Sequence, residues 1–204
     1  IRHAYRIYLN RERKIVNGFA VENIYNITGC GTVVSGFSGI NIKKGETLYL
    51  GPFNNGSFIQ TKVKNIHNDY RFDIQELLEK KRGCLCISVT SQERNFMKKG
   101  MILTKELPKN ICKKFIAKIK ILHHHTTIKP GYQSYINCGM IREPIKINSF
   151  YLSNGTKLDI IRPGEESLAE IEFIRDYNYI EPNQSILFRE GTTRAIGSVV
   201  EIIQ

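Results

Sequence analysis

Short apolar segments alternate with turn residues along most of the chain. The segments are rich in Ile, Val, Tyr and Phe and include Thr32–Val34, Thr47–Leu50, Phe115–Leu122 and Leu168–Ile174. Glycine-containing turn signals separate them at intervals of roughly 8 to 12 residues. This rhythm predicts the strands of an all-β sandwich or barrel.

The periodicity within one segment supports strands over helices. Phe115–Ile121 alternates apolar with polar or small residues, as a strand with one buried face requires. Ile74–Lys81 has helical composition, but its length and the following Gly83 fit a loop or a single turn as readily as a helix. Pro108 interrupts the pattern within Lys105–Asn110, so two small β-domains of similar size are expected.

The charge balance points to a polyanionic partner. Thirty Lys and Arg against 19 Asp and Glu give a net charge of +11, and such a positive field favours nucleic acid or an anionic membrane surface. Nucleic acid is the leading partner. The alternative is that a coding bias toward A and T has spread lysines over a solvated surface.

The lengths of the apolar runs and the number of cysteines indicate the cellular compartment of the protein. Runs such as Ser198–Ile203 are far shorter than the roughly 20 residues that span a bilayer, and the first residues lack a signal-peptide pattern. A cytoplasmic protein without a membrane partner is therefore expected. The cysteines are odd in number and scattered, which favours reduced, partly buried thiols: Cys30, Cys84, Cys86, Cys112 and Cys138.

Two clusters suggest metal chemistry, but neither fits it well. His123-His124-His125 would alternate faces on a strand, and no Cys or carboxylate lies nearby at ligand spacing. Cys84-x-Cys86 differs from the C-x-x-C spacing of zinc knuckles, so the two cysteines are interpreted as core-facing residues of one strand. No metal site is expected.

Candidate catalytic and nucleotide-binding motifs are also weak. Gly29-Cys30-Gly31 and Gly36-Phe37-Ser38-Gly39 fit neither a Walker A loop nor a dinucleotide fingerprint, and no nucleophile elbow or His-Glu-x-x-His pair occurs. Glu165-Glu166 in a turn is more typical of solvated acids than of a catalytic pair. A binding or coupling role without catalytic residues or cofactor in this chain is predicted.

Two strings closely resemble translational GTPases of the elongation factor Tu superfamily. Residues 21–51 contain Gly29-x-Gly31-Thr32-Val33-Val34-Ser35-Gly36 followed by Lys44-Gly45, which is similar to the opening of the second domain. Phe188-Arg189-Glu190-Gly191-Thr192-Thr193-Arg194-Ala195 to Val200 resembles the final hairpin of the third domain. The stretch Leu122–Gly139 most closely resembles the eukaryotic branch called GTP-binding proteins.

The resemblance implies two consecutive antiparallel β-barrels, residues 19–107 and 108–204. Residues 1–18, with Arg2, Arg6, Arg11, Arg13 and Lys14, would be the linker and first strand after a GTPase domain that this sequence lacks. The family delivers aminoacyl-tRNA or a similar ligand to the ribosome, with GTP and Mg bound in that preceding domain. Expected partners are thus tRNA or other RNA, the ribosome and the GTPase domain, with no DNA.

The resemblance also implies two RNA contacts. The 3′ end of an aminoacyl-tRNA would lie near Glu22, Asn23, Tyr25 and Ser35, where an aromatic ring suits an unpaired nucleotide. Asn23 replaces a usual acid and Leu85 stands about where a polar Asn is found in the bacterial factor, which weakens the case for aminoacyl selectivity.

Arg189, Glu190, Gly191 and Thr192 match the stretch that meets the tRNA T-stem backbone, where Arg pairs with phosphate. Alternatively, this turn pairs internally and merely ends a strand. Two other functions remain open for the chain: an RNA-binding or RNA-decay adaptor that does not deliver tRNA, and a metal-dependent hydrolase built on His123–His125.

Overall fold

The computed structural model describes residues 16–203, which divide into two compact units. The first unit runs through Ile111 and also takes in Asp176–Tyr179, while the second comprises Cys112–Arg175 and the chain from Ile180 onward. The predicted boundary between residues 107 and 108 lies shortly before this change. The inclusion of Asp176–Tyr179 in the first unit was not predicted.

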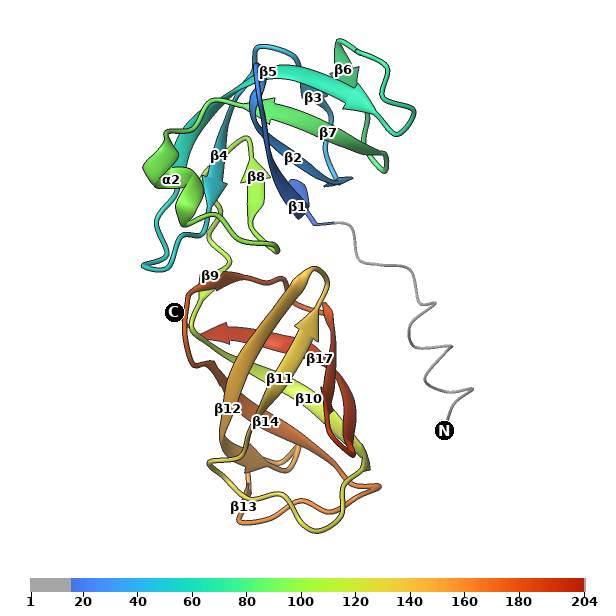
Figure 1. The fold of residues 1–204 in the computed structure, drawn as a ribbon. Helices are drawn as coiled ribbons and strands as arrows, with labels where there is room; N and C mark the ends of the chain where they lie inside the picture. Colours follow the sequence, from blue (N-terminus) through green and yellow to red (C-terminus); the bar gives the residue numbers. More distant parts are fainter. Residues whose placement is uncertain (1–15, 204) are drawn as a thin grey trace. The chain divides into compact units, whose positions relative to one another are not determined.

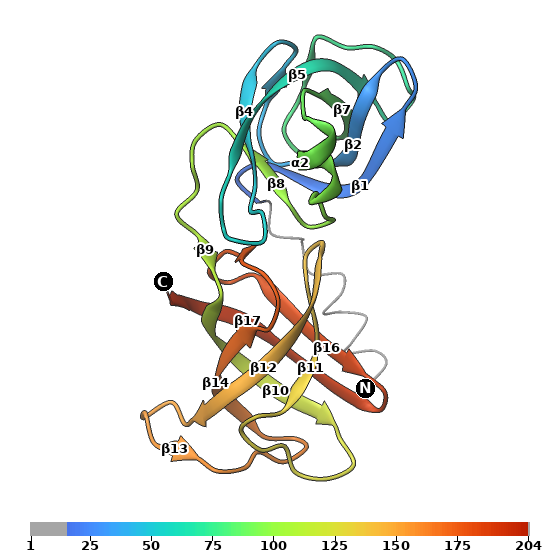
Figure 2. The ribbon, with the colours of Figure 1, turned by 60° about the vertical axis from the view of Figure 1, so that its left-hand side comes forward.

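The first unit is a closed barrel of six strands in the order β1-β2-β7-β5-β4-β8 (Figure 1). Its strands are β1 Phe19–Ile27, β2 Gly31–Ser38, β4 Thr47–Gly51, β5 Ile59–Asn68, β7 Arg82–Ile87 and β8 Ile102–Thr104. Figure 2 shows these strands encircling the core. Apolar side chains that alternate along the strands fill it, including Phe19, Val34, Leu48, Ile66 and Leu85.

Short elements decorate this barrel. β3 Ile42–Lys43 pairs with β6 Glu76–Leu77, so Ile74–Lys81 contributes a short strand and a turn and forms no helix. The one α-helix of the described residues 16–203 is α2, Ser91–Asn95, which the sequence analysis did not predict. It begins with a capping box in which Thr90 and Glu93 satisfy each other's backbone amides.

The second unit is also a closed barrel of six strands. They are β10 Lys114–His123, β11 Gln133–Cys138, β12 Ile141–Tyr151, β14 Glu166–Phe173, β16 Ser185–Glu190 and β17 Thr193–Ile203. A pairing between β11 and β12 completes the ring, and β13 Lys157–Leu158 adds to β12. The predicted alternation in Phe115–Ile121 is confirmed, because Phe115, Ala117, Ile119 and Ile121 are all buried. β9 Ile111–Cys112 and β15 Asn178–Tyr179 form a separate two-stranded sheet.

The glycines of the Gly29–Gly36 string have two structural causes. Gly29 and Gly31 have φ of 79° and 94° in the turn between β1 and β2, a region that favours glycine. A Cβ added at Gly36 would lie 2.0 Å from the carbonyl oxygen of Ala20, so a side chain there would push β1 and β2 apart. The string is therefore specific to this tight hairpin.

Candidate nucleic-acid interface

The structure brings together the four residues predicted to contact a tRNA 3′ end. Glu22, Asn23 and Tyr25 lie on β1, and Asn23 is directly opposite Ser35 of β2. The register shifts between Val21 and Asn23, so the extra residue Glu22 lies at a bulge. Tyr25 is 47% exposed and Asn23 and Ser35 are partly exposed, so these side chains are accessible to a ligand.

The same outward row continues onto two further strands. Ser35 is opposite Cys84 of β7, which is opposite His67 of β5. One step along, Tyr25 is followed in the same way by Val33, Cys86 and Asn65. We call the outward surface that these eight residues form the Tyr25 face: Asn23, Tyr25, Val33, Ser35, Asn65, His67, Cys84 and Cys86.

The prediction that Cys84 and Cys86 face the core is wrong. Leu85, between them, is fully buried in the core of the first barrel, and residues on either side of it in a strand must point outward. Cys86 is nevertheless only 5% exposed, and Cys30 of the β1–β2 turn lies against it with 3.6 Å between the sulfur atoms. Leu85 itself is inaccessible to a ligand.

Two cations next to the Tyr25 face are held by neutral amides. Lys99 Nζ donates to Asn23 Oδ1 at 2.7 Å, and Arg94 Nη1 donates to Asn26 Oδ1 at 3.0 Å. An amide positions a cation without cancelling its charge, so both charges stay available to an anion. Neither Arg94 nor Lys99 was predicted from the sequence. The Thr90-x-x-Glu93 capping signal was the available clue to the helix that carries Arg94.

Glu22 supplies the negative group at this site. Its Oε2 accepts a hydrogen bond from Arg82 Nη1, and its side chain is only 16% exposed. Its Oε1 is buried and has no hydrogen-bond partner among residues 16–203. A buried carboxylate oxygen without a partner is costly, and a ligand donor reaches this covered atom only if the side chain turns outward.

The second predicted contact lies at the tip of the β16–β17 hairpin. Arg189, Glu190, Gly191 and Thr192 are all exposed, and Arg189 is directly opposite Arg194. Neither arginine makes an ion pair with any residue in the described range. Like charges directly opposite each other are destabilising, so this pair favours an anion bound between the two guanidinium groups.

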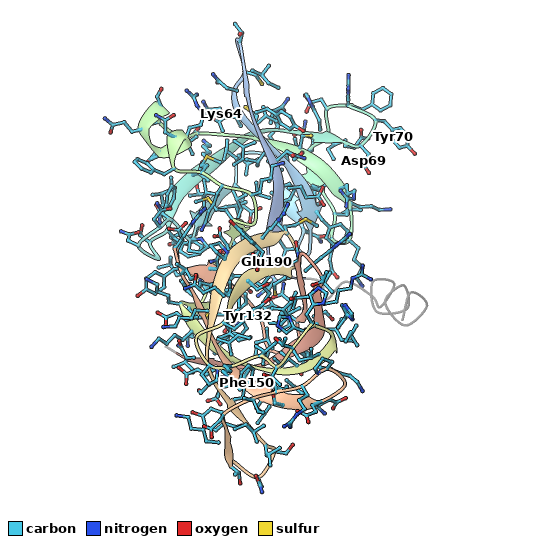
Figure 3. The ribbon with its side chains drawn as sticks, turned by 60° about the horizontal axis from the view of Figure 1, so that its bottom comes forward. Lys64, Asp69, Tyr70, Tyr132, Phe150 and Glu190 are labelled. Carbon is cyan, nitrogen blue, oxygen red and sulfur yellow. The ribbon has the colours of Figure 1, made fainter. Side chains whose placement is uncertain are left out.

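The base of this hairpin is tied to the barrel. Thr193 Oγ1 lies 2.7 Å from His124 Nδ1 and accepts from the Tyr132 hydroxyl at 3.0 Å. In Figure 3, the label of Glu190 shows the hairpin, and the label of Tyr132 shows the residue that anchors its base. His124 therefore has a structural partner. The ring centroids of His123 and His125 lie 5.9 Å apart in an edge-to-face arrangement. Across residues 16–203, no group of three or more His, Cys, Asp or Glu is arranged to hold a metal ion.

The loop after β5 carries two exposed aromatic side chains that the sequence analysis did not single out. Tyr70 is 80% and Phe72 67% exposed, and Figure 3 shows Tyr70 at the tip of this loop. Asn68 Oδ1 accepts from the backbone amides of both residues at 3.0 Å, which orders the loop. Residues 1–15 of the predicted linker and first strand, residues 1–18, lie outside the described residues. No described helix is long and apolar enough to span a membrane.

Comparison with known proteins gives relatives by sequence and by structure, of which three are described. GTP-binding protein 1 of Xenopus laevis is 34% identical over 191 residues, covering 91% of this chain and 27% of that protein. Elongation factor 1-alpha of Cenarchaeum symbiosum is 27% identical over 121 residues, covering 58% of this chain and 26% of that protein. A crystal structure of sup35 complexed with GDP superposes with a TM-score of 0.77 at 21% identity, covering 98% of this chain and 52% of that one.

No family model matches the chain, but these relatives and the fold agree. The two barrels are of the kind that translational GTPases carry as their second and third domains, which confirms the predicted fold class. The chain is thus a translation-factor-like barrel pair, similar in sequence to GTP-binding protein 1 and elongation factor 1-alpha. It spans between a quarter and a third of the length of such curated relatives.

Proposed function

We propose that this chain is the RNA-binding part of a translation-factor-like GTPase, with the acceptor end of an aminoacyl-tRNA or a related RNA bound on the Tyr25 face. The observation that carries the proposal is the combination on one face of β1 of an exposed aromatic ring, Tyr25, and a cation, Lys99, held by the neutral amide of Asn23. Arg94, held by the amide of Asn26 in the same strand, adds a second charge. Aromatic stacking and phosphate contacts are the two terms that bind single-stranded RNA ends.

Glu22 supports recognition of a charged acceptor end. Its Oε1 lacks a partner among residues 16–203. An aminoacyl ester presents an α-ammonium group that donates to a carboxylate, and Glu22 would accept from it once its side chain turns outward. On the second barrel, Arg189 and Arg194, directly opposite each other, would contact RNA phosphates. In the parent protein, a preceding GTPase domain would bind GTP and Mg, hydrolyse GTP and couple its state to RNA binding at the ribosome, in the cytoplasm.

The test is fluorescence anisotropy at two salt concentrations with three RNAs: an aminoacylated acceptor and T-stem minihelix, its uncharged form and an unrelated duplex. We expect the aminoacylated minihelix to bind most tightly. Arg189→Ala should weaken binding about tenfold, because one phosphate contact is lost. Arg162→Ala removes the same charge from an arginine that is paired with Glu165 on the same barrel, and should change little.

Glu22→Gln tests the aminoacyl end separately. It keeps the shape of the side chain but removes the charge, so it should reduce the preference for the aminoacylated over the uncharged minihelix and leave binding of the uncharged form unchanged. Equal binding of both forms by the original chain, with tighter binding of unstructured mRNA, would support the RNA-decay adaptor instead. Equal, steeply salt-dependent binding of all three RNAs would refute a selective site.

A further inference from the structure

Cys30 and Cys86 are distant in sequence but adjacent in the first barrel. Cys30 Sγ donates toward Cys86 Sγ at 3.6 Å, and Cys86 Sγ donates to the Cys30 carbonyl oxygen at 3.2 Å. A disulfide joins sulfur atoms at about 2.05 Å. The two sulfur atoms therefore need to approach by only about 1.5 Å to reach bonding distance.

The surroundings of Cys30 allow that movement. Cys30 lies in the turn between β1 and β2, where Gly29 and Gly31 have positive φ, and a Cβ added at either glycine would have no atom within 4 Å beyond its chain neighbours. One hydrogen bond, from the Cys30 amide to the Ile27 carbonyl at 3.0 Å, closes the turn. The turn can thus shift toward β7 without displacing a packed side chain.

The two thiols differ in the way that a two-step oxidation needs. Cys30 is exposed and Cys86 is buried, and burial, together with the hydrogen bond from Cys30, raises the pKa of the Cys86 thiol. An oxidant therefore meets Cys30 first, and Cys86 is the thiol within reach of the product. Cys84 does not compete, because it lies opposite Ser35 and His67.

We propose that Cys30 and Cys86 are a reversible redox pair whose disulfide fixes the β1–β2 turn against β7 and lowers RNA binding on the Tyr25 face; the second part rests on the proposed function. Cys86 is opposite Val33, the cross-strand neighbour of Tyr25. A bond there draws the turn onto the surface where the RNA end would stack.

The oxidation balances with a peroxide as the oxidant. The Cys30 thiolate attacks one oxygen of hydrogen peroxide, which breaks the O–O bond and gives a sulfenic acid and hydroxide; the hydroxide takes up the proton that the Cys30 thiol had released and becomes water. Cys86 sulfur then attacks the Cys30 sulfur, the S–O bond breaks, and the Cys86 proton leaves with the hydroxide as a second water. Two electrons pass from the two thiols to the peroxide, and a dithiol reductant reverses the reaction by exchange.

Peptide mapping tests the bond itself. The whole chain is treated with hydrogen peroxide, quenched by alkylation and digested without reductant. We expect a linked peptide containing Cys30 and Cys86 that is absent from Cys30→Ser and still present in Cys84→Ser. Alkylated Cys30 and Cys86 after treatment, or Cys30 oxidised without a link to Cys86, would refute the redox pair.

Thermal melting gives a second readout that needs no RNA. The bond closes a long loop, so the oxidised chain should melt roughly 5 °C or more above the reduced chain, and dithiothreitol should remove the difference. The Cys30→Ser variant should show no shift. An unchanged or lower melting temperature in a chain shown by mapping to carry the bond would mean that the bond distorts the fold, which contradicts the proposed fit.

Anisotropy with the uncharged minihelix tests the regulatory part. The oxidised chain should bind at least fivefold more weakly than the reduced chain, and Cys30→Ser should bind equally under both conditions. Equal binding by a chain that carries the bond would refute the regulation and leave the proposed function intact. Absence of binding in both forms would refute the proposed function and leave the redox pair intact.

Discussion

Two pairs of cations, one on the outer surface of each barrel, are held in different ways. On the second barrel, Lys118 and Lys120 of β10 both pair with Glu166 of β14, at 3.3 and 3.2 Å. On the first, Lys99 and Arg94 are held by the amide groups of Asn23 and Asn26. A carboxylate neutralises the cation that it positions, whereas an amide leaves the charge available.

This difference identifies the surface suited to a polyanion better than net charge does. Lysines alone do not mark an RNA-binding surface, because those of β10 already face acids across the sheet. The Tyr25 face combines the amide-held cation Lys99 with an exposed ring, and Asn26 of the same strand holds Arg94. The β16–β17 hairpin carries two arginines without acidic partners in the described range. Four changes, taken from the largest expected effect to the smallest, test this contrast.

Leu85→Asn should cause the largest loss of stability. It tests whether Leu85 points into the core while its neighbours belong to the Tyr25 face. The leucine is fully buried, so the change removes core packing and buries an amide, at a cost of about 3 to 5 kcal/mol in the free energy of unfolding. Urea denaturation measures it. Cys84→Asn, one residue away on the outward side, should cost less than about 1 kcal/mol; similar losses for both variants would contradict the alternation.

Removing both amide-held cations should strongly weaken RNA binding. Arg94→Ala with Lys99→Ala should lower the affinity for the minihelix about tenfold or more and reduce the slope of log affinity against log salt by about 1 to 2. Lys118→Ala with Lys120→Ala removes the same charge from carboxylate-paired lysines and is the matched control. Equal losses in the two double variants would show that only net charge matters.

Tyr25→Ala should weaken binding about tenfold without affecting the fold, since base stacking on an aromatic ring contributes about 1 to 3 kcal/mol. Tyr135→Ala on the second barrel is the control, because Tyr135 is also exposed and contacts Arg142. Anisotropy and thermal melting are measured on both variants. A normal affinity in Tyr25→Ala would remove the aromatic part of the site.

Glu166→Gln should have the smallest effect and should depend on pH. Hydrogen bonds from Lys120 and then Lys118 hold the pKa of Glu166 below its usual range. Because the pKa is lower in the folded state, ionised Glu166 stabilises the fold at pH values above the usual carboxyl pKa. This stabilisation is lost as the pH falls below about 4 and the carboxylate is protonated. Since the pair is solvent-exposed, the variant should melt no more than about 2 °C lower at pH 7, and the two chains should converge at pH 3. A gap that widens in acid would contradict this sign.

Strand periodicity and turn glycines were sufficient to predict much of the fold. Phe115–Ile121 alternates because one face is buried, and the glycines between Gly29 and Gly36 are required by a tight hairpin. The direction of Cys84 and Cys86 was not predictable from their spacing, because an alternating strand fits either choice and only Leu85 in the core settles it. Helix α2 is too short to leave a periodic pattern.

The candidate site was predictable only where a family string covered it. Glu22, Asn23, Tyr25 and Ser35 lie in or next to that string, and pairing of β1 with β2 brings them together. Arg94 and Lys99 come from a helix and a turn far along the chain, and their contacts with Asn26 and Asn23 depend on barrel closure. The approach of Cys30 to Cys86 likewise depends on tertiary structure that no local pattern records.

Asp176–Tyr179 belongs to the first unit although the residues on both sides of it belong to the second. A single cut of the chain therefore cannot separate the two units cleanly. A fragment ending at Ile111 would lack the Lys98–Asp176 ion pair, whose side chains are mostly buried. Recombination between related genes that exchanges only the sequence after Ile111 would therefore also replace Asp176–Tyr179 of the first unit. The two barrels are expected to be inherited together.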